Sequence, residues 1–114
     1  AAHLLIKPKV KPSSLEDWIA LGGAMQRVWL TTTLLGMYLQ PEMTPVIFRW
    51  YARAQRKFSE RPEFVEKARS LAGQFERIAG ASEQQPFGFF CRIGFSPIPK
   101  SRSVRLDLDE LLSR

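Results

Sequence analysis

Three consecutive residues near the C-terminus have the types and spacing to hold an anion. Lys100, Ser101 and Arg102 follow one another with no acid among them. Arginine presents a planar fork of donors, lysine a compact positive charge and serine a hydroxyl. Pro97 and Pro99 fix φ and hold the segment extended, so less entropy is lost when an anion binds. The pattern predicts a phosphate-binding loop; a solvent-exposed basic loop without a ligand is the alternative.

A buried strand is expected to position this loop. Residues 87–95 form an apolar, phenylalanine-rich run that leads into the loop. Cys91 is the only cysteine and lies inside this run, so a buried, inert thiol is predicted rather than a nucleophile. A single cysteine excludes a disulfide within the chain and a multi-cysteine zinc site. His3 is the only histidine, so no metal site built from paired histidines is expected.

Length and charge restrict the class of protein. A chain of 114 residues with 45% hydrophobic content is predicted to form one globular domain at most. The net charge of +6 permits partners such as nucleic acid, an anionic membrane or a phosphorylated ligand. The start of the chain lacks the order of charged, apolar and small residues that a secretory signal needs, so a cytoplasmic location is expected. The chain opens without Met on a strand-like segment, which we interpret as the start of a piece of a larger protein.

The longest predicted element is a helix from about Leu15 to Leu35. Ser13 with Glu16, or Ser14 with Asp17, has the spacing of a capping box at its start. Gly36 is expected to end the helix.

This helix is apolar nearly all round, a property of helices that are central in a core or span a membrane. Arg27 lies near its middle, where a charge costs about 3 kcal/mol in lipid. A helix buried within a dimer is therefore favoured over a membrane span, with Gly22, Gly23 and Gly36 allowing close approach.

Shorter elements are predicted around the long helix. They comprise a strand at 4–6, an extended piece at 37–39, a helix at 45–58 and a helix at 62–79. The helix at 45–58 is expected to bury Val46, Trp50, Ala54 and Phe58 and to expose Arg49, Arg53, Arg56 and Lys57. The helix at 62–79 is expected to bury Phe64, Ala68, Leu71, Phe75 and Ile78. The tail at 104–112 is expected to lie along another element or subunit, with a helical turn at 108–112.

Two separated parts of the chain together resemble the FMN-dependent nitroreductases. Residues 23–41 (GAMQRVWLTTTLLGMYLQP) are similar to the long helix of that family, which packs at the dimer interface and leads to the flavin. Residues 91–95 (CRIGF), 99–102 (PKSR) and 108–111 (LDEL) are similar to its late strand, basic turn and C-terminal extension. The resemblance implies an α+β, nitroreductase-like fold. Residues 1–114 would form the C-terminal portion of a single domain, without the N-terminal portion and its Arg-Ser-x-Arg-type motif.

The resemblance also implies site residues. Lys100 and Arg102, with Ser101 between them, would bind the FMN phosphate. Pro41, Met43 and Thr44 would border the isoalloxazine ring. Many relatives have a Glu-Gly pair where this chain has Met43-Thr44, although a backbone N–H of either residue could still donate to the flavin.

The activity implied is electron transfer from NAD(P)H through FMN to a small organic acceptor, in a ping-pong cycle and by a homodimer. No side chain is expected to be catalytic, because the flavin performs the chemistry. No metal is expected.

Two alternatives from other classes remain open. The first is a non-catalytic nitroreductase-like domain used for binding or regulation, suggested by the absent Arg-Ser-x-Arg motif and the Met43-Thr44 departure. The second is a basic helical module that binds nucleic acid through Arg49, Arg53 and their neighbours, with an affinity that falls steeply with salt.

Overall fold

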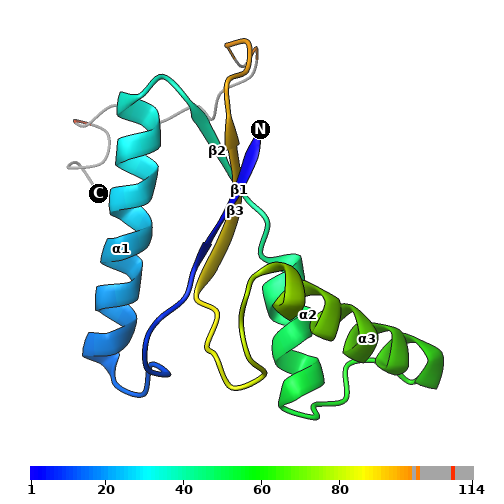
Figure 1. Ribbon diagram of the computed structural model, residues 1–114. Coiled ribbons are helices and arrows are strands. Elements are labelled where there is room, and N and C mark those ends of the chain that lie inside the picture. Colours follow the sequence, from blue (N-terminus) through cyan, green and yellow to red (C-terminus); the bar gives the residue numbers. More distant parts are fainter. Residues whose placement is uncertain (99, 101–108, 110–114) are drawn as a thin grey trace.

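The computed structural model describes residues 1–98, 100 and 109. Within these residues it is a small α+β domain in which three helices flank a three-stranded antiparallel sheet on two sides (Figure 1). The elements are, in chain order, β1 (Ala2–Ile6), α1 (Leu15–Leu34), β2 (Tyr38–Pro41), α2 (Thr44–Arg53), α3 (Pro62–Ile78) and β3 (Phe89–Gly94). The α+β class is confirmed. The predicted helical turn at 108–112 lies outside the described residues, apart from Asp109.

The last strand is the centre of the sheet. Strand β3 lies between β1 and β2 and runs antiparallel to both, with Leu4 opposite Cys91 and Gln40 opposite Arg92. Side chains alternate between the two faces of a strand. Cys91 and Phe89 share one face and are buried, which confirms the prediction of a core strand and a buried thiol.

The two sheet faces carry different helices. Helix α1 lies along one face, where Leu21 fills the space beside Gly88 and leaves no room for a Cβ there. The helices α2 and α3 lie at the other face, where the ring of Phe75 packs edge-on against Phe90 at 5.1 Å between centroids. Figure 1 shows the long helix on one side of the strands and the α2–α3 pair on the other.

The ends of α1 agree with the sequence signals. Ser14 accepts a hydrogen bond from the N–H of Asp17, whose carboxylate accepts from the N–H of Ser14, so the second of the two predicted capping boxes forms. At the other end Gly36 has φ of 71°, and the N–H of Met37 donates to the carbonyl of Thr32 at 2.9 Å. This Schellman arrangement explains why the helix stops where glycine occurs.

Only one side of α1 is covered in the single chain. Thr32 is the one fully buried residue of the helix, whereas Trp18, Ile19 and Leu30 are 57%, 64% and 62% exposed. A Cβ at Gly22 or Gly23 would meet no atom within 4 Å. The sequence predicted a helix buried all round, and this second apolar side stays uncovered within the described residues. Among these residues no helix has the length and apolarity needed to cross a membrane.

Helix α2 differs from its prediction in length and in orientation. It ends at Arg53 instead of reaching Phe58, because Gln55 adopts φ of 51° and the N–H of Arg56 turns back to the carbonyl of Tyr51. Val46 is buried as predicted. Arg49, predicted to face water, is only 7% exposed, while Trp50, predicted to be buried, is 50% exposed. The prediction that Arg49 is exposed to solvent was therefore wrong.

Helix α3 buries a narrower stripe than predicted. Its bounds agree with the sequence, and its buried residues are Ala68, Ala72 and Glu76, which recur every fourth position. Phe64, Leu71 and Ile78 were predicted to be buried, but they are 46%, 51% and 86% exposed. Small alanines let α2 approach closely on one side of α3, which turns the larger apolar residues away from that contact.

Candidate functional site

The turn from β2 into α2 gathers three of the predicted site residues. Pro41 lies opposite Cys91 in the sheet, and the N–H of Glu42 continues the pairing by donating to the carbonyl of Phe90 at 2.9 Å. Met43 then caps α2, accepting a hydrogen bond from the N–H of Ile47, and Thr44 is the first helical residue. Pro41, Met43 and Thr44 therefore lie together at one turn, and their role at a flavin ring stays a prediction.

This turn presents donors without partners. Among the described residues, the N–H groups of Met43 and Thr44 donate to no protein acceptor. The first N–H groups of any helix lack partners within the helix, and they carry the positive end of its dipole. Met43 supplies no side-chain cap, so no described residue competes with a ligand for these donors.

A large apolar cavity opens beside the turn. It has a volume of about 730 Å³ and lies between α2, α3, their connection and the sheet. Thr44 and Pro45 form the wall nearest the turn. Five phenylalanines line the rest of the cavity together with aliphatic residues, and they are Phe48, Phe58, Phe64, Phe75 and Phe90.

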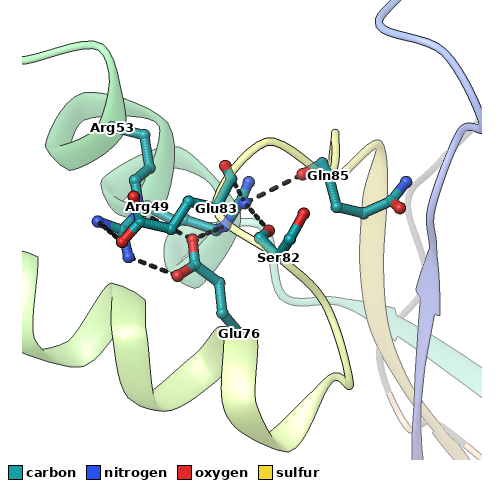
Figure 2. Close-up of polar contacts among 6 residues, drawn as sticks. All are labelled: Arg49, Arg53, Glu76, Ser82, Glu83 and Gln85. Carbon is teal, nitrogen blue, oxygen red and sulfur yellow. Dashed lines mark hydrogen bonds and ion pairs between the residues drawn. The ribbon is translucent and has the colours of Figure 1, made fainter.

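A buried ion cluster fixes the helices behind this cavity (Figure 2). The carboxylate of Glu76 on α3 accepts a hydrogen bond from Arg49 Nε at 2.7 Å and from Arg53 Nε at 2.9 Å, and Arg53 Nη2 is also paired with it. Hydrogen bonding by Arg53 is the largest cause that lowers the pKa of Glu76 from its ordinary value; hydrogen bonding and charge from Arg49 add to it, against the opposing effect of burial. The acid is therefore ionised at neutral pH and joins α2 to α3.

Arg49 also fixes the loop that leads into β3. Its Nη2 donates to three backbone carbonyls, those of Ser82, Glu83 and Gln85, at 3.2, 3.0 and 3.0 Å. The guanidinium lies over the ring of Phe87 at 3.8 Å from its centroid. A single buried arginine thus connects α2, α3 and the approach to the central strand.

Sequence reasoning missed this cluster. Arg49 was assigned to a solvent-exposed basic face, and Glu76 was not considered at all. A signal was present, because Ala68, Ala72 and Glu76 recur every fourth residue on α3. Small residues at this spacing indicate that another helix packs closely against α3. An acid in the same stripe would then be buried, so the neighbouring helix must supply a cation to pair with it.

A second polar contact lies beside the β2–α2 turn. Glu42 Oε2 lies 3.2 Å from His3 Nε2, and the His3 ring stacks on Phe90 with 5.3 Å between centroids. Burial raises the pKa of the Cys91 thiol, and the charge of Glu42 raises it further. Cys91 therefore stays protonated and unreactive, as the sequence predicted.

The basic loop is described only at Lys100. Lys100 is exposed, and Ser101 and Arg102 lie outside the described residues. Strand β3 ends at Gly94 opposite Tyr38, at the other end of β2 from Pro41. The described residues therefore do not bring Lys100 to the Pro41–Thr44 turn, and the phosphate-binding loop stays a prediction.

The basic face expected for a nucleic-acid module is largely neutralised. Arg49 and Arg53 pair with Glu76, Arg53 also reaches Glu83 at 3.1 Å, and Lys57 pairs with Glu60 at 2.6 Å. Phosphate binding needs cations that face solvent without a protein partner. The pairing leaves this alternative without most of the charges on which it was based.

The comparisons with known proteins add no relative. No family model, no curated protein and no solved structure matches this chain.

Proposed function

We propose that this chain is part of an FMN-dependent NAD(P)H oxidoreductase of nitroreductase type that transfers electrons to a small organic acceptor. One observation carries the proposal: the turn from β2 into α2 leaves the N–H groups of Met43 and Thr44 without acceptors among the described residues. A flavin ring offers acceptor nitrogens and oxygens to such donors. The element order around this turn also agrees with the resemblance, since a long helix ending at Gly36 leads through β2 to it.

Two groups of residues have the chemistry to bind parts of FMN. Pro41, Met43 and Thr44 would border the ring, and the free N–H groups suit its acceptor atoms. Lys100, Ser101 and Arg102 would hold the phosphate, for which a fork of donors and a point charge are suited. FMN would supply the hydride and electron chemistry, while the chain would orient it and exclude water.

We propose that the exposed apolar side of α1 packs against a second copy of the chain in a homodimer. Five large apolar residues on this side of α1 are 40–70% exposed: Leu15, Trp18, Ile19, Trp29 and Leu30. A contiguous exposed apolar patch of this kind marks an interaction surface.

The charges beside this patch suit self-association. Arg27 and Glu16 lie on opposite sides of Gly22 along α1, so an antiparallel pair of helices crossing at Gly22 would bring unlike charges together. We expect Ile19→Glu to convert a dimer into monomers in sedimentation velocity. A dimer that survives this change would contradict the proposed interface.

The test of FMN binding is a titration of the longest gene product, followed by flavin fluorescence. The variant Lys100→Ala/Arg102→Ala removes two proposed phosphate contacts. The matched control, Lys9→Ala/Lys11→Ala, removes the same charge from two exposed lysines of the linker after β1. We expect binding to weaken at least about 100-fold in the first variant, the loss of two charge-assisted contacts, and to be unchanged in the control. Equal affinities for both variants, or no FMN binding by the folded protein, would contradict the proposal.

A second candidate function rests on Met43-Thr44. These residues stand where many nitroreductases have a Glu-Gly pair, so the polar group usually present on the substrate side is missing. A non-catalytic domain that binds FMN or a similar ligand for regulation would have this feature. Such a domain would bind FMN but would not oxidise NADH or NADPH when an acceptor is supplied.

A further inference from the structure

The cavity between α2 and α3 has the size and walls of a ligand site. Ligand pockets in proteins typically enclose about 300–1,000 Å³, and this one has about 730 Å³. Phe48 and Phe58 pack edge-on at 5.1 Å on one side, and Phe75 packs against Phe90 on another. These rings hold one another in place, so the walls are formed before any ligand arrives.

The apolar side of α3 makes the cavity long. Phe64, Leu71 and Ile78 recur every seventh residue, and all three line the cavity while remaining substantially exposed. The helix rises about 16 Å between Lys67 and Ile78 at its standard rise per residue. An elongated apolar body would cover this row better than a compact one.

The charge around the cavity is of one sign. Among the residues that the structure describes, no acid lines it, and the two cations that do are Lys67 and Arg49. Arg49 is already engaged by Glu76 and three backbone carbonyls. Lys67 is exposed and makes no ion pair among the described residues. The acids near Lys67 on α3 are occupied, since Glu63 pairs with Arg61 and Glu66 with Arg69, each at 2.6 Å.

We propose that this cavity binds an elongated amphiphile with one carboxylate, such as a medium-chain fatty acid. The carboxylate pairs with Lys67 at the mouth, and the alkyl chain lies along Leu71, Phe75 and Ile78 against the phenylalanine rings. Within the described part of the chain, one cation without an ion-pair partner beside a long apolar cavity that no acid lines favours this chemistry over neutral or cationic ligands. The inference does not depend on FMN binding, since it uses neither Lys100 nor the β2–α2 turn donors.

The experiment is isothermal titration calorimetry of the full chain without FMN, with dodecanoate and dodecanol as matched probes. We expect saturable binding of one dodecanoate per chain. Lys67→Met keeps the apolar stem and removes the charge, so it should weaken dodecanoate binding about tenfold and leave dodecanol binding unchanged. The control Lys9→Met, in the exposed linker, should alter neither affinity. Leu71→Gln places a polar group on the cavity wall and should weaken both probes.

Three results would overturn the inference. One is equal dodecanoate affinity in the wild type and Lys67→Met. The second is dodecanoate affinity that Leu71→Gln leaves unchanged. The third is the absence of saturable dodecanoate binding by protein that circular dichroism shows to be folded. This result counts against the inference also when sedimentation shows that a second copy of the chain covers the cavity.

Discussion

The two sides of α3 differ in what they bury: one side packs against α2 through a buried acid, and the other exposes large apolar residues along the cavity. The side toward α2 buries a charged residue, Glu76, one turn after two small alanines, Ala68 and Ala72. The other side carries Phe64, Leu71 and Ile78, and leaves them exposed along the cavity. A helix in a globular protein usually buries its large apolar residues and exposes its charges. Here one charge, Glu76, is buried and three large apolar residues are exposed, while the other charges of α3 face solvent as usual.

The difference indicates what each side is for. A buried ion cluster gains little net free energy over an apolar contact, but removing one member leaves a charge buried without its partner. The cluster therefore defines how α2, α3 and the loop before β3 fit together. The apolar side contributes little to that fit, which leaves it available for an added ligand.

The largest expected effect is on the polar side. Glu76→Gln would remove the charge that pairs with Arg49 and Arg53, and should lower the free energy of unfolding by about 3 kcal/mol. Urea denaturation measures this change. The matched control is Glu66→Gln, because Glu66 forms an exposed pair with Arg69 and should contribute less than about 1 kcal/mol. Equal effects of the two substitutions would break the comparison.

Acid should remove the same contribution in the wild-type protein. The pKa of Glu76 in the folded state lies below its ordinary value of 4.5, so the stability it provides is complete above pH 4.5 and decreases as the pH falls through the lowered folded pKa. The difference in unfolding free energy between wild type and Glu76→Gln should therefore shrink below pH 4.5. A difference that stays constant down to pH 2 would show that the ion pairs do not supply it.

A substitution in the connection between α2 and α3 is expected to raise the stability by a smaller amount. Gln55 adopts φ of 51°, which glycine tolerates and other residues adopt at a cost. Gln55→Gly should raise the melting temperature slightly, corresponding to about 0.5–1 kcal/mol. Gly80 occupies the equivalent position after α3 with φ of 55°, so Gly80→Gln should cost a similar amount. Changes of the same sign in both variants would contradict this explanation.

The smallest expected effect on stability is on the apolar side. Leu71→Gln should change the free energy of unfolding by no more than about 0.5 kcal/mol, because Leu71 is 51% exposed. Its thermal melting curve should nearly coincide with that of the wild type. A loss comparable to that of Glu76→Gln would show that the apolar side also holds the fold together.

The sequence predicted where the helices and strands lie better than it predicted which of their side chains are buried. The capping box at Ser14, the stop at Gly36 and the buried strand around Cys91 rest on local signals, and each was confirmed. Arg49 could not be placed, because its burial depends on Glu76, which lies 27 positions away. The apolar pattern of α1 and α3 likewise predicted that both are helices. It did not predict which of their large apolar side chains are buried within a single chain.

The position of the Pro41–Thr44 turn follows from the sequence, whereas its role as a site stays a prediction. Pro41, Met43 and Thr44 do meet at one turn, because neighbours in sequence are positioned by a single strand-to-helix connection. The cavity was not predicted, since its walls come from α2, α3, their connection and Phe90. Such a site depends on tertiary packing, for which the sequence carries no local signal.

The most direct measurement of the proposed activity is anaerobic spectroscopy of the longest gene product loaded with FMN. We expect NADH or NADPH to bleach the flavin absorbance, and a quinone or nitroaromatic acceptor to restore it. Flavin that stays oxidised after addition of either nucleotide would contradict the proposed oxidoreductase activity and favour the non-catalytic binding domain.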